Sequence, residues 1–124
     1  SLKVEPEAEC VLADKDRMTQ VFVNILENAA RYNDKEKPTC NVRSEKIDDS
    51  VVISFSDNGI GVSEKHLSKI FDSFYQVDMG SGRKVGGTGL GLSICRGIMA
   101  AHGGKIWAEQ NPKGGTVFKI SLSL

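Results

Sequence analysis

Hydrophobic residues recur at helical spacing in two long stretches of the chain. The first stretch follows Asp14 and Asp16, either of which can accept a hydrogen bond from a first helical turn. Its apolar face comprises Met18, Val21, Phe22, Ile25, Leu26 and Ala29. The second stretch runs from Leu90 to His102 and ends at Gly103-Gly104, a pair suited to helix termination. The pattern therefore predicts two amphipathic helices.

Other segments alternate between apolar and polar residues or lie between turn signals. Val51, Ile53 and Phe55 share one face of an expected strand. Further strands are expected at Cys10–Ala13, Thr39–Lys46, Lys105–Glu109 and Thr116–Leu122. A hairpin tip is expected at Asp48-Asp49, and a turn from Asn111-Pro112 to Gly115. Ser63 can cap a short helix at Glu64–Phe71. A helical layer on a mixed sheet is the simplest architecture for this order, and the fold class is α/β.

Length, charge and cysteine content limit the classes of protein to which this chain can belong. The 124 residues suffice for one domain, and the formal net charge of zero gives no basic field for nucleic acid. Three cysteines, with no CxxC pair, suit a reducing cytosol better than a disulfide scaffold or a zinc site. No apolar run approaches the length of a membrane span. We expect a cytoplasmic domain without nucleic-acid or membrane contact, and a membrane anchor of a parent protein would lie outside this chain.

A glycine cluster leads directly into the second predicted helix. Residues 86–94 read GGTGLGLSI. Glycine backbone can approach a polyanion closely, and the first amides of a helix have no partner inside the helix. The cluster lacks the Gly-Lys-Ser/Thr ending of a P-loop and the preceding strand of a dinucleotide fingerprint. It predicts a phosphate site, although a flexible linker before a core helix would show the same glycines.

The first helix carries a polar stripe beside its apolar face. Gln20, Asn24, Asn28 and Arg31 are spaced by four, four and three residues, which places them on one side. Carboxamide oxygens are hard donors suited to Mg²⁺, and arginine is a natural phosphate contact. An ordinary solvent-facing helix surface would carry the same residue types, and this segment alone does not separate the two interpretations.

A carboxylate ends the strand at 51–55 and is followed by glycines, in the run Asp57-Asn58-Gly59-Ile60-Gly61. Asp57 can accept a hydrogen bond from an exocyclic amine, and the glycines leave room for a flat base. A plain Asp-Asn-Gly turn is the alternative for this segment alone.

Four segments taken in order are more specific than any one of them. Residues 24–29 resemble the N box, 57–61 the G1 box, 71–75 the F box and 87–92 the G2 box. In these segments the chain resembles the catalytic, ATP-binding domain of two-component sensor histidine kinases, from about Asp14 to Leu122.

The resemblance implies a Bergerat-type two-layer α/β sandwich with a mobile ATP lid, and ATP and Mg²⁺ as ligands. Asn28 would coordinate Mg²⁺ and Asn24 would support or share that role. Asp57 would accept the adenine amine, and Phe71 and Phe74 would anchor one end of the lid. Both phenylalanines are also expected to be plain core aromatics, which is compatible with that role. The remaining nucleotide-binding residues implied by the family are Arg31, Tyr32, Gly59, Gly61, Lys84, Gly87, Thr88, Gly89, Leu90, Gly91 and Thr116.

The chain departs from the family pattern at several positions. Ser73 and Gln76 stand where many members carry a base near the terminal phosphate. His66 and His102 are the only histidines, and neither lies in a helical hairpin with an acidic neighbour. Surface or capping roles are expected for both. We therefore expect residues 1–124 to be one domain of a longer kinase whose dimerisation and phosphoacceptor domain lies elsewhere. That domain and a downstream response regulator are the expected partners, and the isolated chain is expected to be inactive.

Two other functions stay open at this point. ATP hydrolases of the gyrase and heat-shock chaperone type place a glutamate one turn before the magnesium asparagine, where this chain has Asn24. Glu27 does not replace that glutamate, because each residue turns the helix by about 100° and Glu27 therefore faces away from Asn28. This difference favours phosphoryl transfer over hydrolysis. A degenerate module that binds nucleotide without transfer is the third possibility.

Overall fold

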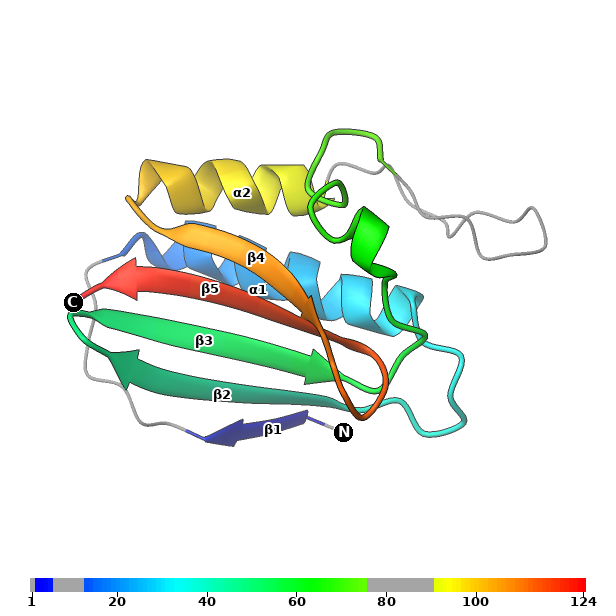
Figure 1. Cartoon of the computed structure of the whole chain (residues 1–124). Coiled ribbons are helices and arrows are strands. Elements are labelled where there is room, and N and C mark those ends of the chain that lie inside the picture. Colours follow the sequence, from blue (N-terminus) through cyan, green and yellow to red (C-terminus); the bar gives the residue numbers. More distant parts are fainter. Residues whose placement is uncertain (1, 6–12, 76–90) are drawn as a thin grey trace.

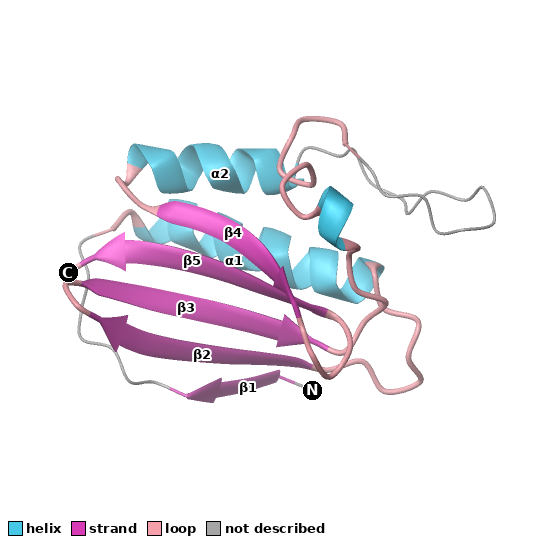
Figure 2. Cartoon of the chain, viewed as in Figure 1, coloured by secondary structure: helices cyan, strands magenta, loops and turns pink. Residues whose placement is uncertain are grey.

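A mixed sheet carries two helices on one face (Figures 1 and 2). The computed structural model describes residues 2–5, 13–75 and 91–124. The strands are β1 (Leu2–Glu5), β2 (Cys40–Ile47), β3 (Ser50–Asp57), β4 (Lys105–Gln110) and β5 (Thr116–Ser123), and the helices are α1 (Lys15–Arg31) and α2 (Gly91–Ala101). The sheet order is β1-β2-β3-β5-β4. Only β1 runs parallel to its neighbour in this sheet, so the predicted mixed two-layer α/β sandwich is confirmed.

The first helix forms as its residue pattern predicts. Asp14 caps α1 by accepting a hydrogen bond from the Arg17 backbone N–H at 3.1 Å. Val21, Ile25 and Ala29 are buried one turn apart, which turns this face of α1 toward the sheet and α2. The adjacent polar stripe along α1 is partly or fully exposed.

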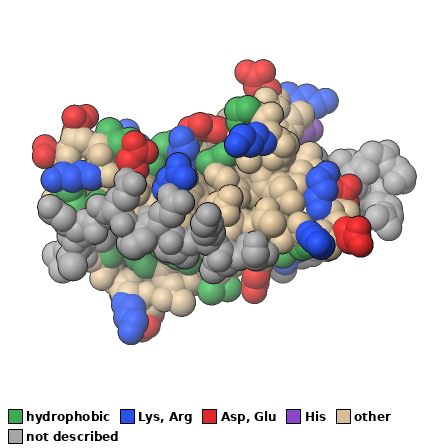
Figure 3. All heavy atoms as spheres, turned by 90° about the horizontal axis from the view of Figure 1, so that it is seen from below, with side chains coloured by type: hydrophobic (Ala, Val, Ile, Leu, Met, Phe, Trp, Pro, Cys, Tyr) green, Lys and Arg blue, Asp and Glu red, His purple; other side chains and the backbone are tan. Residues whose placement is uncertain are grey.

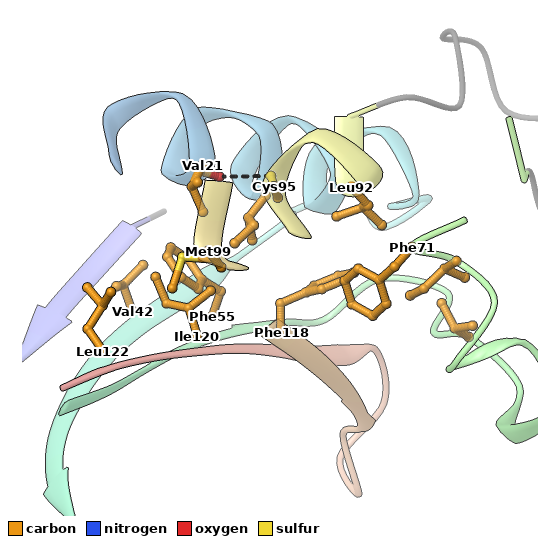
Figure 4. Close-up of a cluster of buried hydrophobic side chains, with 13 residues drawn as sticks. Val21, Val42, Phe55, Phe71, Leu92, Cys95, Met99, Phe118, Ile120 and Leu122 are labelled. Atoms are coloured by element: carbon orange, nitrogen blue, oxygen red, sulfur yellow. Dashed lines mark hydrogen bonds between the residues drawn. The ribbon is translucent and has the colours of Figure 1, made fainter. Parts of the chain in front are cut away.

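Aromatic and aliphatic side chains from both layers form one core (Figure 4). Phe55 and Phe118 are each 1% exposed, and the Phe118 ring meets the Phe71 ring edge-on with centroids 6.3 Å apart. The two helices touch where the Cys95 thiol donates to the Val21 carbonyl at 3.8 Å. This packing fixes the helices on the sheet and so fixes the strand ends where the candidate site lies.

Three expectations for local structure were wrong or fall outside the described residues. The predicted helix at 64–71 is only a 3₁₀ turn, Glu64–His66, followed by turns, and the Ser63 side chain makes no capping hydrogen bond. Ala13, the end of an expected strand, is not in a strand, and residues 10–12 lie outside the described ranges. The first strand is instead β1, which was not predicted from the sequence.

The surface carries both charges. Figure 3 shows basic and acidic side chains interspersed on the face seen from below, in keeping with the zero net charge.

Within residues 2–5, 13–75 and 91–124, no helix is long and apolar enough to cross a membrane.

Candidate functional site

The end of β3 carries a buried carboxylate. Asp57 is 6% exposed, and its Oδ1 accepts hydrogen bonds from the backbone N–H groups of Gly59 at 2.9 Å and Thr116 at 3.1 Å. Burial raises the pKa of Asp57 above its ordinary value, while the two backbone hydrogen bonds act in the opposite direction. Among the described residues, both hydrogen bonds to the carboxylate end on Oδ1. Oδ2 is therefore the atom that remains to accept a hydrogen bond from a ligand.

Glycines surround Asp57 because the backbone passes it too closely for a side chain. A Cβ on Gly115 would lie 2.1 Å from the Asp57 carbonyl oxygen and 2.7 Å from Oδ1. A Cβ on Gly59 would lie 2.5 Å from the Tyr32 carbonyl oxygen. Gly61 has φ +78° and would bring its Cβ to 3.2 Å from the Gly115 carbonyl oxygen. Gly59 and Gly61 thus have a structural role in this loop in addition to the predicted one of leaving space for a base.

Asn58 joins the loop after β3 to the loop before β2. Its Oδ1 accepts from Asn33 Nδ2 at 2.7 Å and from the Thr39 N–H at 2.9 Å, and its Nδ2 donates to the Lys37 carbonyl at 3.1 Å. The Ile60 N–H also donates to the Tyr32 carbonyl at 3.0 Å. The loop that carries Gly59 is therefore held against the C-terminal end of α1, where Tyr32 forms the cap.

A cysteine lies opposite Asp57 in the sheet. Cys40 of β2 is paired with Asp57 in the antiparallel register and is partly buried. Burial, and next the Asp57 charge, raise the pKa of the Cys40 thiol to about 11. The thiol therefore stays protonated at neutral pH and adds no second charge beside the carboxylate.

The polar stripe on α1 lies as the helical spacing predicted. Asn24 and Asn28 are partly exposed and Arg31 is exposed. Asn24 Nδ2 donates to the Gly91 carbonyl at 3.3 Å, which joins the stripe to the first residue of α2. The structure thus brings Asn24 to Gly91 and brings Tyr32 to Gly59, while Asp57 lies beside Thr116.

Several expected site residues lie outside the described part of the chain. Lys84, Gly87, Thr88, Gly89 and Leu90, like Gln76, lie outside the described residues. Gly91 is described and begins α2. Over the described ranges, no group of three or more His, Cys, Asp and Glu side chains is placed to hold a metal ion. The amide oxygens of Asn24 and Asn28 are hard donors of the kind that Mg²⁺ accepts.

The two F-box aromatics behave differently from each other. Phe71 is 5% exposed and belongs to the core, but Phe74 is 71% exposed with φ +66°. The interpretation of both as core aromatics was therefore wrong for Phe74. Its backbone lies in a region that a bulky residue rarely adopts.

Both histidines have structural partners. His66 Nδ1 contacts the Tyr75 hydroxyl. His102 Nδ1 lies 2.8 Å from the Ile98 carbonyl oxygen, and its Nε2 accepts from the Asp14 N–H at 3.1 Å. His102 thus connects the C-terminal end of α2 to the cap of α1, in agreement with the expected capping role.

The contribution of the β4–β5 turn to the site was not predicted from the sequence. Gln110 Nε2 donates to the Val62 carbonyl at 3.2 Å, and Asn111 Nδ2 donates to the Asp57 carbonyl at 3.1 Å. The sequence signal is the Asn-Pro-x-Gly-Gly run directly before Thr116, which by itself predicts only a turn. This turn brings the Thr116 amide to Asp57.

The mixed sheet under two helices defines a two-layer α/β sandwich, and a buried aspartate lies at one strand end beside close-packed glycines. Residues 13–124 match the family described as histidine kinase-, DNA gyrase B-, and HSP90-like ATPase. The chain belongs to this family, and it is similar to the ATP-binding domains of its sensor histidine kinases.

Individual relatives agree with this placement. The sensor protein kinase WalK of Staphylococcus haemolyticus (strain JCSC1435) is 44% identical over 110 residues, which is 88% of this chain and 18% of WalK. The chain therefore spans less than one-fifth of the length of that relative. The catalytic domain of histidine kinase ThkA is 34% identical, with a TM-score of 0.79 over 98% of this chain and 77% of the ThkA domain.

Two other solved structures show related domains with bound molecules. ThkA in complex with the response regulator protein TrrA is 32% identical, with a TM-score of 0.75 over 98% of this chain and 33% of that one. Full-length ShkA in complex with AMPPNP is 28% identical, with a TM-score of 0.81 over 98% of this chain and 24% of ShkA.

Proposed function

We propose that the chain binds Mg-ATP and transfers the γ-phosphoryl group to a histidine on a separate dimerisation and phosphoacceptor domain. The proposal rests on the hydrogen bonding of the buried Asp57 carboxylate. Its Oδ1 is held by two backbone amides, and Oδ2 is left as an acceptor for the adenine amine. The AMPPNP complex of ShkA supports binding of an adenine nucleotide, because AMPPNP is an ATP analogue with the same base.

The phosphate end of the ligand is assigned to the α1 stripe and the start of α2. Asn28 would offer its amide oxygen to the metal, with Asn24 beside it, and Arg31 would offset phosphate charge. Asn24 already donates to the Gly91 carbonyl, so its Oδ1 is the atom available to a metal. Bound Mg²⁺ would neutralise charge on the phosphate oxygens. Lys84 and residues 87–91 are proposed for the phosphates on sequence grounds.

Transfer is favoured over hydrolysis by the residue one turn before Asn28. A hydrolase needs a general base for water there, and the Asn24 amide cannot take up a proton. Both histidines are engaged in contacts within the fold. The acceptor histidine is therefore assigned to another domain of the parent kinase, and a response regulator is the downstream partner. The cytoplasm, where ATP is available and thiols stay reduced, is the proposed location.

The test uses radiolabelled ATP with the purified chain and its own dimerisation and acceptor domain. We expect acid-labile, base-stable label on that partner, no label on the chain itself, and little phosphate release by the chain alone. Asn28→Ala should abolish transfer, and Asn41→Ala, which changes an exposed asparagine on β2, should not. Steady phosphate release without labelled partner would replace the kinase assignment with a hydrolase. Nucleotide binding with neither activity would identify the degenerate module, for which Ser73 and Gln76 are the only sequence support.

A further inference from the structure

Every polar group of Asn111 is used, and three of the four serve the β4–β5 turn. The Asn111 N–H donates to the Gly115 carbonyl at 3.1 Å, its carbonyl accepts from the Gly114 N–H at 2.9 Å, and its Oδ1 accepts from the Lys113 N–H at 3.1 Å. The fourth group, Nδ2, leaves the turn and donates to the Asp57 carbonyl at 3.1 Å. Turn closure alone does not require this last bond.

The turn delivers a second contact to the same residue. Thr116 follows the turn directly, and its N–H donates to Asp57 Oδ1 at 3.1 Å. Between the two contacts, Gly115 passes so close to the Asp57 carbonyl that a Cβ would lie 2.1 Å from it. Asp57 is therefore held by the turn at its main chain through Asn111 and at its side chain through Thr116.

Hydrogen bonds join the turn and the loop after β3 beside an open hollow. A hollow of about 720 Å³ lies between the loop after β3 and the turn, lined by residues 60–63, 110–112, 114 and 115. Gln110 and Asn111 line this hollow, and each donates to the loop that follows β3, one at Val62 and one at Asp57. Directional hydrogen bonds therefore set the distance between the turn and the loop here.

We propose that Asn111 is a positioning residue for adenine recognition: its side-chain amide anchors the β4–β5 turn to the Asp57 main chain and thereby sets the direction of Asp57 Oδ2. The proposal rests on the assignment of Asp57 to the adenine amine. Without the anchor, the Thr116 amide can move away from Oδ1, and the carboxylate can rotate. The base contact then weakens, although the phosphate contacts on α1 and α2 stay in place.

Asn111→Asp is the sharpest variant, because it has the same shape and keeps Oδ1 for the Lys113 N–H. It replaces the donor to the Asp57 carbonyl with a carboxylate oxygen, which cannot donate and which adds a negative charge. Asn41→Asp is the matched control, since it introduces the same charge in a second groove, over β2, β3 and β5, which Asn41 and Asn111 both line. Asn111→Ala adds a variant without a new charge.

The measurement is calorimetric affinity for Mg-ADP and for Mg-IDP, whose base carries an oxygen in place of the amine. We expect the ADP affinity of both Asn111 variants to fall by about fivefold or more, as for a lost hydrogen bond, with IDP affinity unchanged. The amide proton resonances of Gly59 and Thr116 in the free protein should shift in the same variants. Asn41→Asp should match the wild type in all three readouts.

The outcomes separate this proposal from the one on which it rests. Equal loss of ADP and IDP would show a general structural effect and overturn the positioning role. Wild-type ADP affinity in both Asn111 variants, with affinity lost in Asp57→Asn, would overturn the positioning role alone. Failure of the wild type to bind ADP, or equal ADP affinity in Asp57→Asn, would overturn the adenine assignment and this proposal with it.

Discussion

Replacing Asp57 with asparagine tests the base contact directly. The amide keeps an Oδ1 for the Gly59 and Thr116 N–H groups but presents an N–H₂ donor where Oδ2 stood. A hydrogen bond to a charged group contributes about 1.5–3 kcal/mol, and an unpaired buried donor adds about 1–3 kcal/mol of cost. A total of about 3 kcal/mol lowers ADP affinity roughly a hundredfold. IDP, with an acceptor at that position, should bind the variant at least as well as it binds the wild type.

The same substitution should not destabilise the free protein at neutral pH. Burial raises the folded-state pKa of Asp57 above its ordinary 3.8, so the native state binds more protons than the unfolded chain above that pH. The free energy of unfolding contributed by this group therefore falls as pH rises through that window. The amide of the Asp57→Asn variant does not titrate there. Urea unfolding across pH 4 to 7, chosen to begin about where unfolded aspartate titrates, should show wild-type stability declining relative to the variant.

Calorimetry and denaturation together decide this prediction. ADP affinity equal to that of the wild type would remove Asp57 from the base contact. Lost ADP affinity accompanied by a large drop in stability would assign Asp57 a structural role instead. The combination of weaker ADP binding and undiminished stability is the result that the geometry requires.

Four further substitutions give separate tests. Gly115→Ala should destabilise the fold by roughly 2–4 kcal/mol in urea unfolding, because a Cβ would lie 2.1 Å from the Asp57 carbonyl and φ is +93°. Asn28→Ala should abolish the Mg²⁺ dependence of ADP affinity in calorimetry and leave the unfolding midpoint close to that of the wild type. Phe118→Ala should cost about 3–5 kcal/mol in the same unfolding assay, since the ring is 1% exposed in the core. His66→Ala should leave phosphoryl transfer to the partner domain intact in the radiolabel assay.

The long helices and the central hairpins could be predicted from the sequence because their patterns are local and repeated. The apolar face of α1 recurs over 17 residues, and its cap precedes it directly. Strand β1 could not be predicted in this way, because Leu2–Glu5 has four residues and pairs in parallel with β2, almost forty positions later in the chain. The position of β1 in the sheet depends on the edge of β2 with which it pairs, and not on a pattern of apolar and polar residues within β1 itself.

The base end of the candidate site was only partly predictable for a related reason. Asp57, Gly59 and Gly61 lie in one short segment with a recognisable order of residues. Asn111 is 54 residues away from the carbonyl to which it donates. Its own segment shows only the composition of a turn, and nothing local indicates which main-chain group the side chain will meet.

The position of Asp57 at a strand end explains how the fold tolerates a buried carboxylate. Inside β3 every amide is taken by β2 or β5, whereas beyond Asp57 the chain leaves the sheet and its amides become available. Gly59 supplies one such amide from the loop after β3, and Thr116 supplies another from the start of β5. Two backbone dipoles stabilise the charge, and both of these hydrogen bonds end on Oδ1. A carboxylate held in this way keeps Oδ2 for a ligand, and the β4–β5 turn must hold glycine at position 115 because a Cβ there would lie 2.1 Å from the Asp57 carbonyl oxygen.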